Sequence, residues 1–149
     1  MTESKWRLDG MPLIISAIKR EVEQFYLAPA ESDTIEIRVR RISTPTSSVC
    51  YYVRKVQLPQ SVEKQKFLIS EEEYMALRDR RQGRVLNFTR YRTASYEFDE
   101  YHGAQEGLII ATTSLERSEI PHDFGEDITN SIRYSNPAMA KWWISVSNG

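Results

Sequence analysis

The chain has 149 residues and a formal net charge of −1, so it carries no overall excess of cations that would favour duplex nucleic acid or an anionic membrane surface. Its 40% hydrophobic and 28% charged residues are ordinary for a globular protein and argue against a disordered chain. The single cysteine, Cys50, excludes an internal disulfide, and no Cys/His set has the spacing of a zinc site. We therefore expect one domain over residues 1–149, in which any basic site is a local concentration of charge.

The N-terminus lacks the basic start and long apolar run of a signal peptide. The longest apolar runs, at 13–15 and 108–111, are far too short to span a bilayer. These features predict a cytoplasmic protein without a membrane partner, a setting that also suits one unpaired thiol.

In chain order, residues 11–18 are predicted to form a short helix and residues 21–27 a strand. The clearest pattern follows at 34–41, where apolar and polar residues alternate with the period of a half-buried strand. Its apolar face holds Ile35, Ile37 and Val39, and its polar face holds Glu36, Arg38 and Arg40. Residues 49–56 are predicted to pair with it as a hairpin, because Ser, Thr and Pro fill the intervening turn at 43–48.

A further strand is predicted at 62–69, and a helix follows it. Ser70 has the sequence position of an N-cap, with Glu73 as its capping-box partner. The helix is expected to turn Tyr74, Leu77 and Met75 toward the sheet and to end near Gln82 and Gly83.

Three more strands are predicted at 85–93, 95–101 and 108–115, and short helices are predicted in the C-terminal part of the chain. The fold class is therefore α+β and mainly β, with antiparallel strands and a few flanking helices.

Cations recur on the polar faces of these strands, where a half-exposed sheet normally carries mixed residues. They are Arg38, Arg40, Lys55, Lys64, Lys66, Arg90 and Arg92. If the strands close into a barrel, these side chains line one lumen and repel one another unless a polyanion fills it. The alternative for each cation alone is a solvent-facing position that protects a sheet edge.

Several segments, in this order, resemble the sequence signature of the CYTH, or triphosphate tunnel, family. They are an Arg-x-Arg strand, a strand ending in Arg-Tyr, an aromatic-Glu-x-Asp segment, a Gly-Leu strand and a closing Arg-Tyr-x-Asn, at 38–40, 86–91, 96–103, 107–111 and 121–140. Residues 22–27 are similar to the family's second strand, and the resemblance covers about 3–140, which leaves 141–149 as a C-terminal tail.

The resemblance implies a closed or nearly closed eight-stranded antiparallel tunnel, as in relatives that include inorganic triphosphatases, thiamine triphosphatases and one class of adenylate cyclase. In that family Arg and Lys hold a triphosphate, and carboxylates hold one or two Mg²⁺ or Mn²⁺ ions. Carried over, the phosphate ligands are Lys5, Arg38, Arg40, Lys55, Lys64, Lys66, Arg90 and Arg92. The remaining metal ligands are Glu3, Glu97 and Asp99.

The sequence departs from the family at the acidic positions. Met1 stands at the first of the N-terminal glutamates, and Lys64 and Lys66 stand where the family has carboxylates. Phe88 replaces a Lys, and Thr112 and Ser114 replace paired Glu residues. The cations are thus kept while the metal ligands are depleted, which favours binding of a polyanion with little or no metal-dependent hydrolysis.

Three functions stay open at this point. The first is a tunnel that binds a nucleotide, triphosphate, polyphosphate or signalling oligonucleotide; the second is a triphosphatase with a reduced acidic site, needing Mg²⁺ or Mn²⁺. The third is a scaffold for protein interaction, in which the lysines simply face water. Nothing in the sequence indicates a base-recognition pocket, which disfavours a cyclase. His102 and His122 are expected on the surface, and Trp142-Trp143 is either a core plug or an exposed patch.

Overall fold

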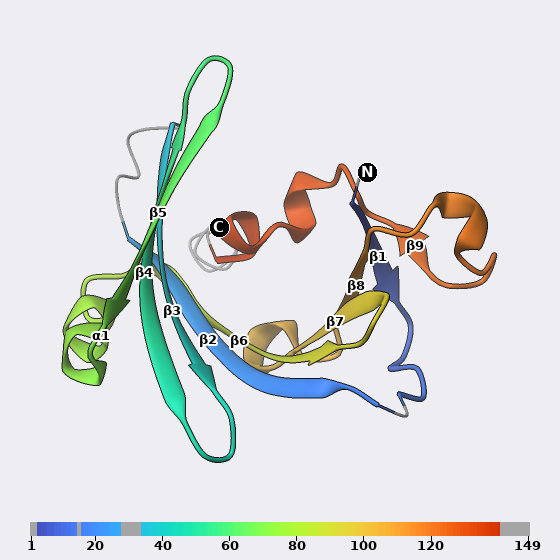
Figure 1. Ribbon diagram of the computed structural model, residues 1–149, viewed down its shortest axis with the longest axis horizontal. Helices are drawn as coiled ribbons and strands as arrows, with labels where there is room; N and C mark the ends of the chain where they lie inside the picture. The colour runs from blue at the N-terminus through green and yellow to red at the C-terminus, as the bar shows by residue number, and fades with distance from the viewer. Residues whose placement is uncertain (1–2, 15, 28–33, 141–149) are drawn as a thin grey trace.

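The computed structural model describes residues 3–14, 16–27 and 34–140. Its main element is a nine-stranded antiparallel sheet with the strand order β5-β4-β3-β2-β6-β7-β8-β1-β9 (Figure 1). The strands are β1 (Ser4–Leu8), β2 (Ile18–Leu27), β3 (Ile35–Ser43), β4 (Ser48–Gln57), β5 (Val62–Ile69), β6 (Gln82–Arg92), β7 (Tyr96–Tyr101), β8 (Ile109–Thr113) and β9 (Glu126–Asp127). The helices are α1 (Glu71–Arg78) and the short 3₁₀ turns η1 (Gly103–Gln105), η2 (Arg117–Glu119) and η3 (Ile132–Tyr134), and the described chain ends in α-helical residues 136–140.

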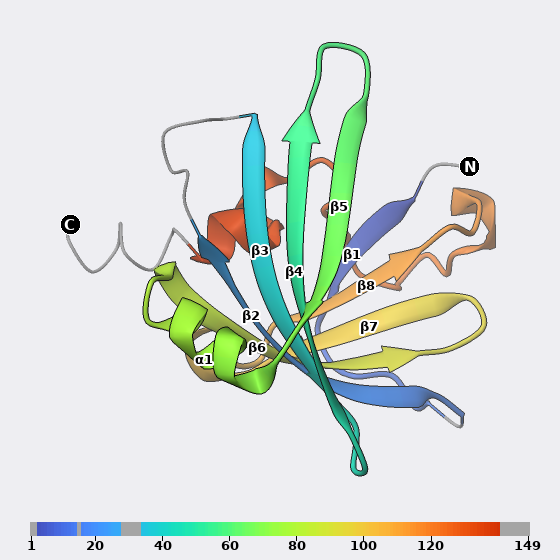
Figure 2. The same ribbon diagram turned by 60° about the vertical axis from the view of Figure 1, so that its left-hand side comes forward.

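The sheet curls into a trough with two arms. Strands β3, β4 and β5 form one arm, β7, β8 and β1 form the other, and β2 and β6 form the floor between them (Figures 1 and 2). The C-terminal part of the described chain runs from the β1 side across the opening between the arms. The concave side of the sheet is therefore partly covered by its own chain.

The expected closed or nearly closed eight-stranded barrel is corrected in two respects. A ninth strand, β9, adds two residues to the outer edge of β1. Within the described residues β5 pairs only with β4 and β9 only with β1, so the sheet stays open between these two edges. Closure requires the two edge strands to come within hydrogen-bonding distance. Here the C-terminal segment occupies the opening between the arms instead.

Hydrophobic clusters lie on both faces of the sheet. On the concave face Val22, Phe88, Tyr101 and Ile110 pack against a C-terminal group that includes Met139. On the convex face α1 places the fully buried Tyr74 in a cluster with Phe25, Val39 and Cys50. A third cluster, under β1, β7 and β8, contains Leu8, Phe98, Ile109 and Ala111. Since α1 anchors β3 and β4 from outside, the polar concave face of that arm is left uncovered by helix.

The capping box predicted for α1 is confirmed. Glu73 N donates to Ser70 Oγ at 3.0 Å, and Ser70 N donates to Glu73 Oε1 at 3.2 Å. Tyr74 is buried and Leu77 is partly buried, as expected, but Met75 is 45% exposed and faces solvent. The helix ends at Arg78, four residues earlier than predicted, because Gln82 and Gly83 already belong to β6.

The strands predicted from alternation are confirmed with small shifts of their ends, and residues 62–69 match β5 at both ends. The predicted helix at 11–18 is wrong: its described residues form no helix, and Ile18 begins β2. Met11 and Ile14 instead pack against the cluster under β1, β7 and β8. Trp142-Trp143 falls outside the described residues. Among those residues, none of the helices combines the length and apolar character needed to cross a membrane.

Candidate functional site

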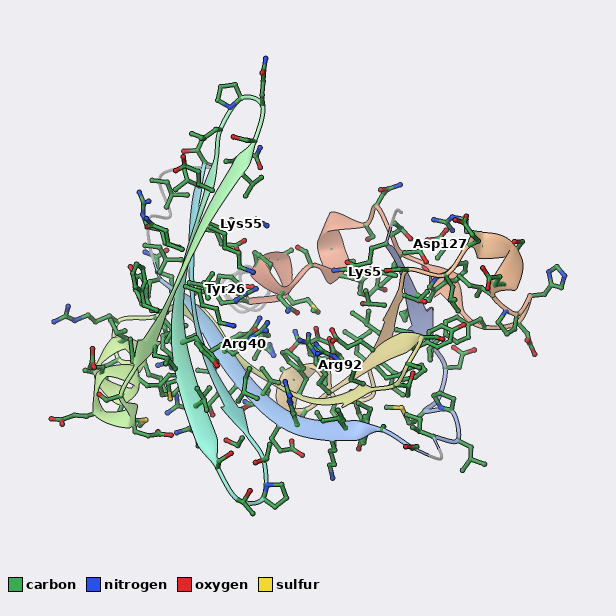
Figure 3. All side chains as sticks on the ribbon, in the orientation of Figure 1. Lys5, Tyr26, Arg40, Lys55, Arg92 and Asp127 are labelled. Carbon is green, nitrogen blue, oxygen red and sulfur yellow. The ribbon has the colours of Figure 1, made fainter. Side chains whose placement is uncertain are left out.

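Five cations on β3, β4 and β5 share the concave face, and we call them the cationic arm: Arg38, Arg40, Lys55, Lys64 and Lys66. The register explains why, because residues directly opposite in an antiparallel ladder point to the same side. Lys55 lies opposite Lys64, and the other members follow at intervals of two along their strands. In Figure 3 Lys55 and Arg40 point into the trough from this arm.

The cationic arm is not neutralised by the rest of the described protein. None of its five members has a carboxylate within ion-pair distance among the described residues. Glu36 lies on the same face, opposite Lys55, but does not reach that distance. The Nε of Arg38 is buried and has no hydrogen-bond partner among those residues. The arm is therefore a concentrated and uncompensated positive surface.

Arg40 is held by a neutral partner. Its Nε and Nη2 both donate to Oε1 of Gln24, at 2.8 and 2.5 Å, and Gln24 is fully buried on β2. Burial, together with the charges of Arg38 and Arg90, lowers the pKa of Arg40 to about 10. Gln24 Nε2 in turn donates to the hydroxyl of Tyr26 at 3.3 Å. The guanidinium is thus fixed in position while its charge remains available to a ligand.

The lysines of the cationic arm also interact electrostatically with one another. Burial and the nearby charges of Arg38, Lys66 and Lys55 lower the pKa of Lys64. Lys66 places its ammonium 4.0 Å from the centroid of the Tyr51 ring, a cation–π contact that orients it on the concave face. Burial is the larger cause of the lowered pKa of Lys64, and the neighbouring cations add to it.

The floor strand β6 and the neighbouring strand β7 of the other arm carry balanced charge. Arg90 on β6 donates from Nε and Nη2 to the two oxygens of Asp99 on β7, at 2.8 and 3.0 Å. Glu97 lies 3.2 Å from Arg90 Nε and accepts from Arg92 Nη2 at 2.8 Å. Burial opposes the charge on Arg90, but the hydrogen bond and charge of Asp99, with the charge of Glu97, raise its pKa overall. Burial raises the pKa of Asp99, and Arg90 works against that rise.

A pocket of about 120 Å³ lies against this balanced group, and we call it the inner pocket. It is lined by residues from β1, β6, β7, β8 and the C-terminal segment, among them Glu3, Lys5, Arg90, Glu97, Asp99, Tyr134 and Asn136. Lys5 points into the trough from the arm opposite Lys55 (Figure 3). The hydroxyl of Tyr101 donates to Asn136 Oδ1 at 2.5 Å and ties the C-terminal segment to this wall.

The structure thus brings the predicted residues to one concave face. The predicted phosphate ligands lie along the whole concave face, with Arg90 and Arg92 on the floor strand β6 and Lys5 on the arm across from the cationic arm. The three predicted metal ligands, Glu3, Glu97 and Asp99, all line the inner pocket.

A divalent metal does not fit these carboxylates as they stand. Among the described residues, no three His, Cys, Asp or Glu side chains converge as a ligand set. Both oxygens of Asp99 accept from Arg90, and Glu97 is shared between Arg90 and Arg92. A metal would have to displace guanidinium groups from both carboxylates. The assignment of Mg²⁺ or Mn²⁺ to them remains a prediction.

Sequence reasoning missed Gln24, Tyr51 and Tyr134. Gln24 is a buried polar residue on an inward position of a strand, which is the signal that would have revealed it.

The two histidines differ in their exposure. His122 is exposed, as expected, whereas His102 is half-buried, with its Nε2 2.7 Å from the hydroxyl of Thr89. The register places Thr89 on the convex face, away from the trough.

Comparison with known proteins supports the architecture. No family model matches the sequence, and no curated protein does so. Two crystal structures of the protein NE1496, described in one as hypothetical and in the other as an inorganic triphosphatase, align with this chain at a TM-score of 0.74 and 23% identity. The alignments cover 94% and 95% of this chain and 97% of NE1496. The chain therefore has the fold of that inorganic triphosphatase, which confirms, at the level of the fold, the resemblance to the CYTH family drawn from its sequence.

Proposed function

We propose that this protein binds a polyanionic phosphate ligand, such as a nucleotide, triphosphate, polyphosphate or signalling oligonucleotide, in its trough, with little or no metal-dependent hydrolysis. The observation behind the proposal is the cationic arm, whose five members form no ion pair among the described residues.

A bound polyanion would relieve electrostatic repulsion among the cations of the cationic arm. Like charges placed directly opposite in a ladder destabilise a sheet, and Lys55 and Lys64 are so placed. The two arginines add charge nearby, and Arg40 is held by Gln24 without being neutralised. A phosphate chain supplies several acceptor oxygens, and a hydrogen bond to a charged group contributes about 1.5–3 kcal/mol. The ligand therefore replaces repulsion by several charge-assisted contacts.

Weak hydrolysis follows from the state of the carboxylates. Activation of water by a divalent metal needs ligand oxygens that are free to coordinate it. Here Asp99 and Glu97 already accept from Arg90 and Arg92. Lys64 and Lys66 add positive charge to the same trough, which further disfavours a metal cation.

Calorimetric titration with tripolyphosphate in EDTA tests the proposal. Wild-type protein is expected to bind without metal, and Lys64→Gln and Lys66→Gln to weaken the affinity by about 10- to 150-fold each. Lys19→Gln is the matched control, because Lys19 lies on the convex face opposite Tyr91. Absence of binding, or an equal loss in the Lys19 variant, contradicts the proposal.

A second candidate is a triphosphatase that uses Mg²⁺ or Mn²⁺. Two observations favour it: the fold is shared with the inorganic triphosphatase NE1496, and Glu3, Glu97 and Asp99 line one pocket with Lys5. Release of phosphate from tripolyphosphate, lost in Asp99→Asn but kept in the exposed control Asp123→Asn, would establish it. No release with either metal, alongside tight binding in EDTA, supports the first candidate instead.

A further inference from the structure

Strand β5 is an open edge of the sheet and is the outermost strand of its arm (Figure 2). Within the described residues it pairs only with β4, and it is exposed from Val62 to Leu68. Alternate residues of an antiparallel strand turn their N–H and C=O groups away from the neighbour with which they pair. The free side of β5 therefore carries a row of donors and acceptors that can template another strand. Its eight residues exceed the length of an average strand and leave room for a whole added one.

Large apolar side chains are exposed along this edge. Val62, Phe67 and Leu68 are 47%, 51% and 72% exposed, and they make up half of the large hydrophobic residues that are exposed in the described chain. The Phe67 ring lies 6.3 Å from the ring of Tyr52 on the convex face, so it packs on one side only. An edge with unpaired backbone groups and exposed apolar side chains on both faces has the features of an interaction site.

Two lysines determine which strand can be added. Lys64 and Lys66 lie on the concave face of β5 and form no ion pair among the described residues. Residues directly opposite in a ladder point to the same side, so an added strand sets every second side chain against these lysines. Carboxylates at those two positions form attractive cross-strand pairs. Phe67, next to Lys66, points to the convex face, where it meets an apolar or aromatic side chain of the added strand.

The same lysines oppose pairing with a second copy of this chain. Two edge strands that pair antiparallel about a two-fold axis keep their concave faces on one side, so concave residues oppose concave residues. The two registers that pair most of β5 are centred on Gln65 and on Lys66. The first sets Lys64 of each copy opposite Lys66 of the other, and the second sets the two copies of Lys66 opposite each other. The edge therefore disfavours its own copy and favours an acidic strand.

We propose that β5 is the docking site for an extended acidic segment of a partner protein, which adds to the sheet as one more antiparallel strand. In chain order the segment carries an apolar residue, an aromatic residue, an acidic residue, a residue of any type, an acidic residue and a basic residue. These lie opposite, in turn, Leu68, Phe67, Lys66, Gln65, Lys64 and Glu63. The proposal goes beyond phosphate binding and does not depend on it, although two of the lysines are shared.

Calorimetric titration with the synthetic peptide acetyl-Val-Phe-Glu-Thr-Glu-Lys-amide tests the proposal. Wild-type protein is expected to bind it, and to bind a peptide with Lys in place of both Glu residues about 2- to 30-fold more weakly. The double variant Lys64→Glu/Lys66→Glu is expected to reverse this preference, because it sets carboxylates against the lysines of the second peptide. A preference that does not reverse, or absence of binding to wild type, overturns the proposal and leaves the phosphate-binding function untouched.

N-methylation of the peptide distinguishes strand addition from simple attraction of charge. A strand directs alternate amides to opposite edges, and only one of its edges faces β5. Methylation of one alternate set of amides is therefore expected to abolish binding, while methylation of the other set changes the Kd less than about twofold. Equal effects of the two sets would show that the peptide does not bind as a strand.

The apolar contact has its own variant. Phe67→Ala is expected to raise the Kd for the peptide by about 1.5- to 5-fold, because it removes the side chain that the added strand meets on the convex face. Met75→Ala is the matched control, since Met75 is similarly exposed, at 45%, but lies on α1. Sedimentation velocity of the free protein tests the other occupant. A dimer that dissociates in Phe67→Ala would assign the edge to a second copy and overturn the proposal.

Discussion

Lys55 and Lys64 face each other directly across the β4–β5 ladder, and neither has a carboxylate within ion-pair distance among the described residues. Opposed like charges destabilise a sheet, whereas opposed opposite charges stabilise it. The unliganded protein therefore keeps an arrangement that weakens its own fold, at the place where it presents most positive charge.

The first prediction concerns this pair. Lys64→Glu converts a repulsive cross-strand pair into an attractive one, so the free protein is expected to gain about 0.2–1 kcal/mol of unfolding free energy. The same change places a carboxylate on the cationic arm and is expected to abolish measurable binding of tripolyphosphate. Urea unfolding and calorimetry measure the two effects.

Gln65→Glu is the matched control for this variant. It also introduces a carboxylate on the same strand, with a charge change of one unit where Lys64→Glu changes two, but Gln65 lies opposite Arg54 on the convex face. Similar stabilisation with unchanged binding is expected. A loss of binding in both variants would show that net charge, and not the concave arrangement, determines affinity.

The second prediction concerns pH. Nearby cations and burial lower the pKa of Lys64, and Arg40 has a pKa of about 10. Both groups therefore begin to lose protons at a lower pH than exposed residues of the same kind. A bound polyanion favours their charged forms, so affinity for tripolyphosphate is expected to fall as pH rises from 9 to 11, with proton uptake on binding. Calorimetry near pH 9.5 in two buffers of different ionisation enthalpy measures that uptake.

The lowered pKa of Arg40 also makes the free energy of unfolding depend on pH, in the direction opposite to that of the binding affinity. Because the folded pKa of Arg40 is below its unfolded value, the unfolded chain holds more protons between pH 10 and the ordinary arginine range. This group therefore destabilises the fold at lower pH, and the destabilisation is relieved as pH rises across that window. A binding constant that stays flat from pH 9 to 11 would exclude Lys64 and Arg40 as ligand contacts.

A third prediction tests the neutral partner of Arg40. Gln24→Glu places a carboxylate beside a guanidinium that now contacts an amide oxygen at 2.5 and 2.8 Å. The new ion pair neutralises Arg40, and we expect tripolyphosphate affinity to fall by about tenfold or more, as for loss of one charge-assisted contact. Gln65→Glu again serves as control. Unchanged affinity would show that Arg40 has only a structural role.

A fourth prediction concerns the contact between β6 and the C-terminal segment. Gly83 has φ +75°, and a Cβ at this position would lie 2.5 Å from the carbonyl oxygen of Ala140. Gly83→Ala is therefore expected to combine about 1–2 kcal/mol of backbone strain with about 1–3 kcal/mol of overpacking. Gly103→Ala has a similar φ of +71° but open space around its Cβ, so it reports the strain alone. Equal losses in the two variants would show that Ala140 moves away freely.

The fifth prediction separates stability from binding. The hydroxyl of the fully buried Tyr74 donates to Glu23 Oε1 at 2.6 Å on the convex face. Tyr74→Phe is expected to cost about 1–3 kcal/mol of unfolding free energy, because it removes a partner of a charged group. Binding of tripolyphosphate is expected to remain within twofold, as α1 lies outside the trough. Reduced affinity in this variant would imply that α1 holds the cationic arm in its binding geometry.

The sequence predicted the faces of the strands well because the pleat imposes a period of two, and residues 62–69 show the benefit. Lys64 and Lys66 were assigned to one face, and the register places both on the concave side. The helix predicted at 11–18 was wrong because a short apolar run does not by itself distinguish a helix from an irregular segment that packs on a core. Gly83 was interpreted as following a helix end, although its positive φ serves the start of β6.

Properties that depend on long-range contacts were less predictable. Parity alone does not show that Arg90 lies opposite Asp99 and Arg92 opposite Glu97, a pairing that gives two of the expected metal ligands arginine partners. Closure of the barrel also depends on where β5 and β9 end in space, and no local pattern encodes that.

The open edge of β5 has a kinetic consequence. Within the part of the chain that the structure describes, this strand has a hydrogen-bonded neighbour on one side only, and it is exposed on both faces from Val62 to Leu68. Segments with few buried contacts open at a lower free energy than the whole fold. Amide hydrogens of β5 are therefore expected to exchange with deuterated water far sooner than those of β3, which is flanked by β2 and β4. A ligand that binds Lys64 and Lys66 would slow that exchange, so the edge strand can serve as a built-in reporter of occupancy.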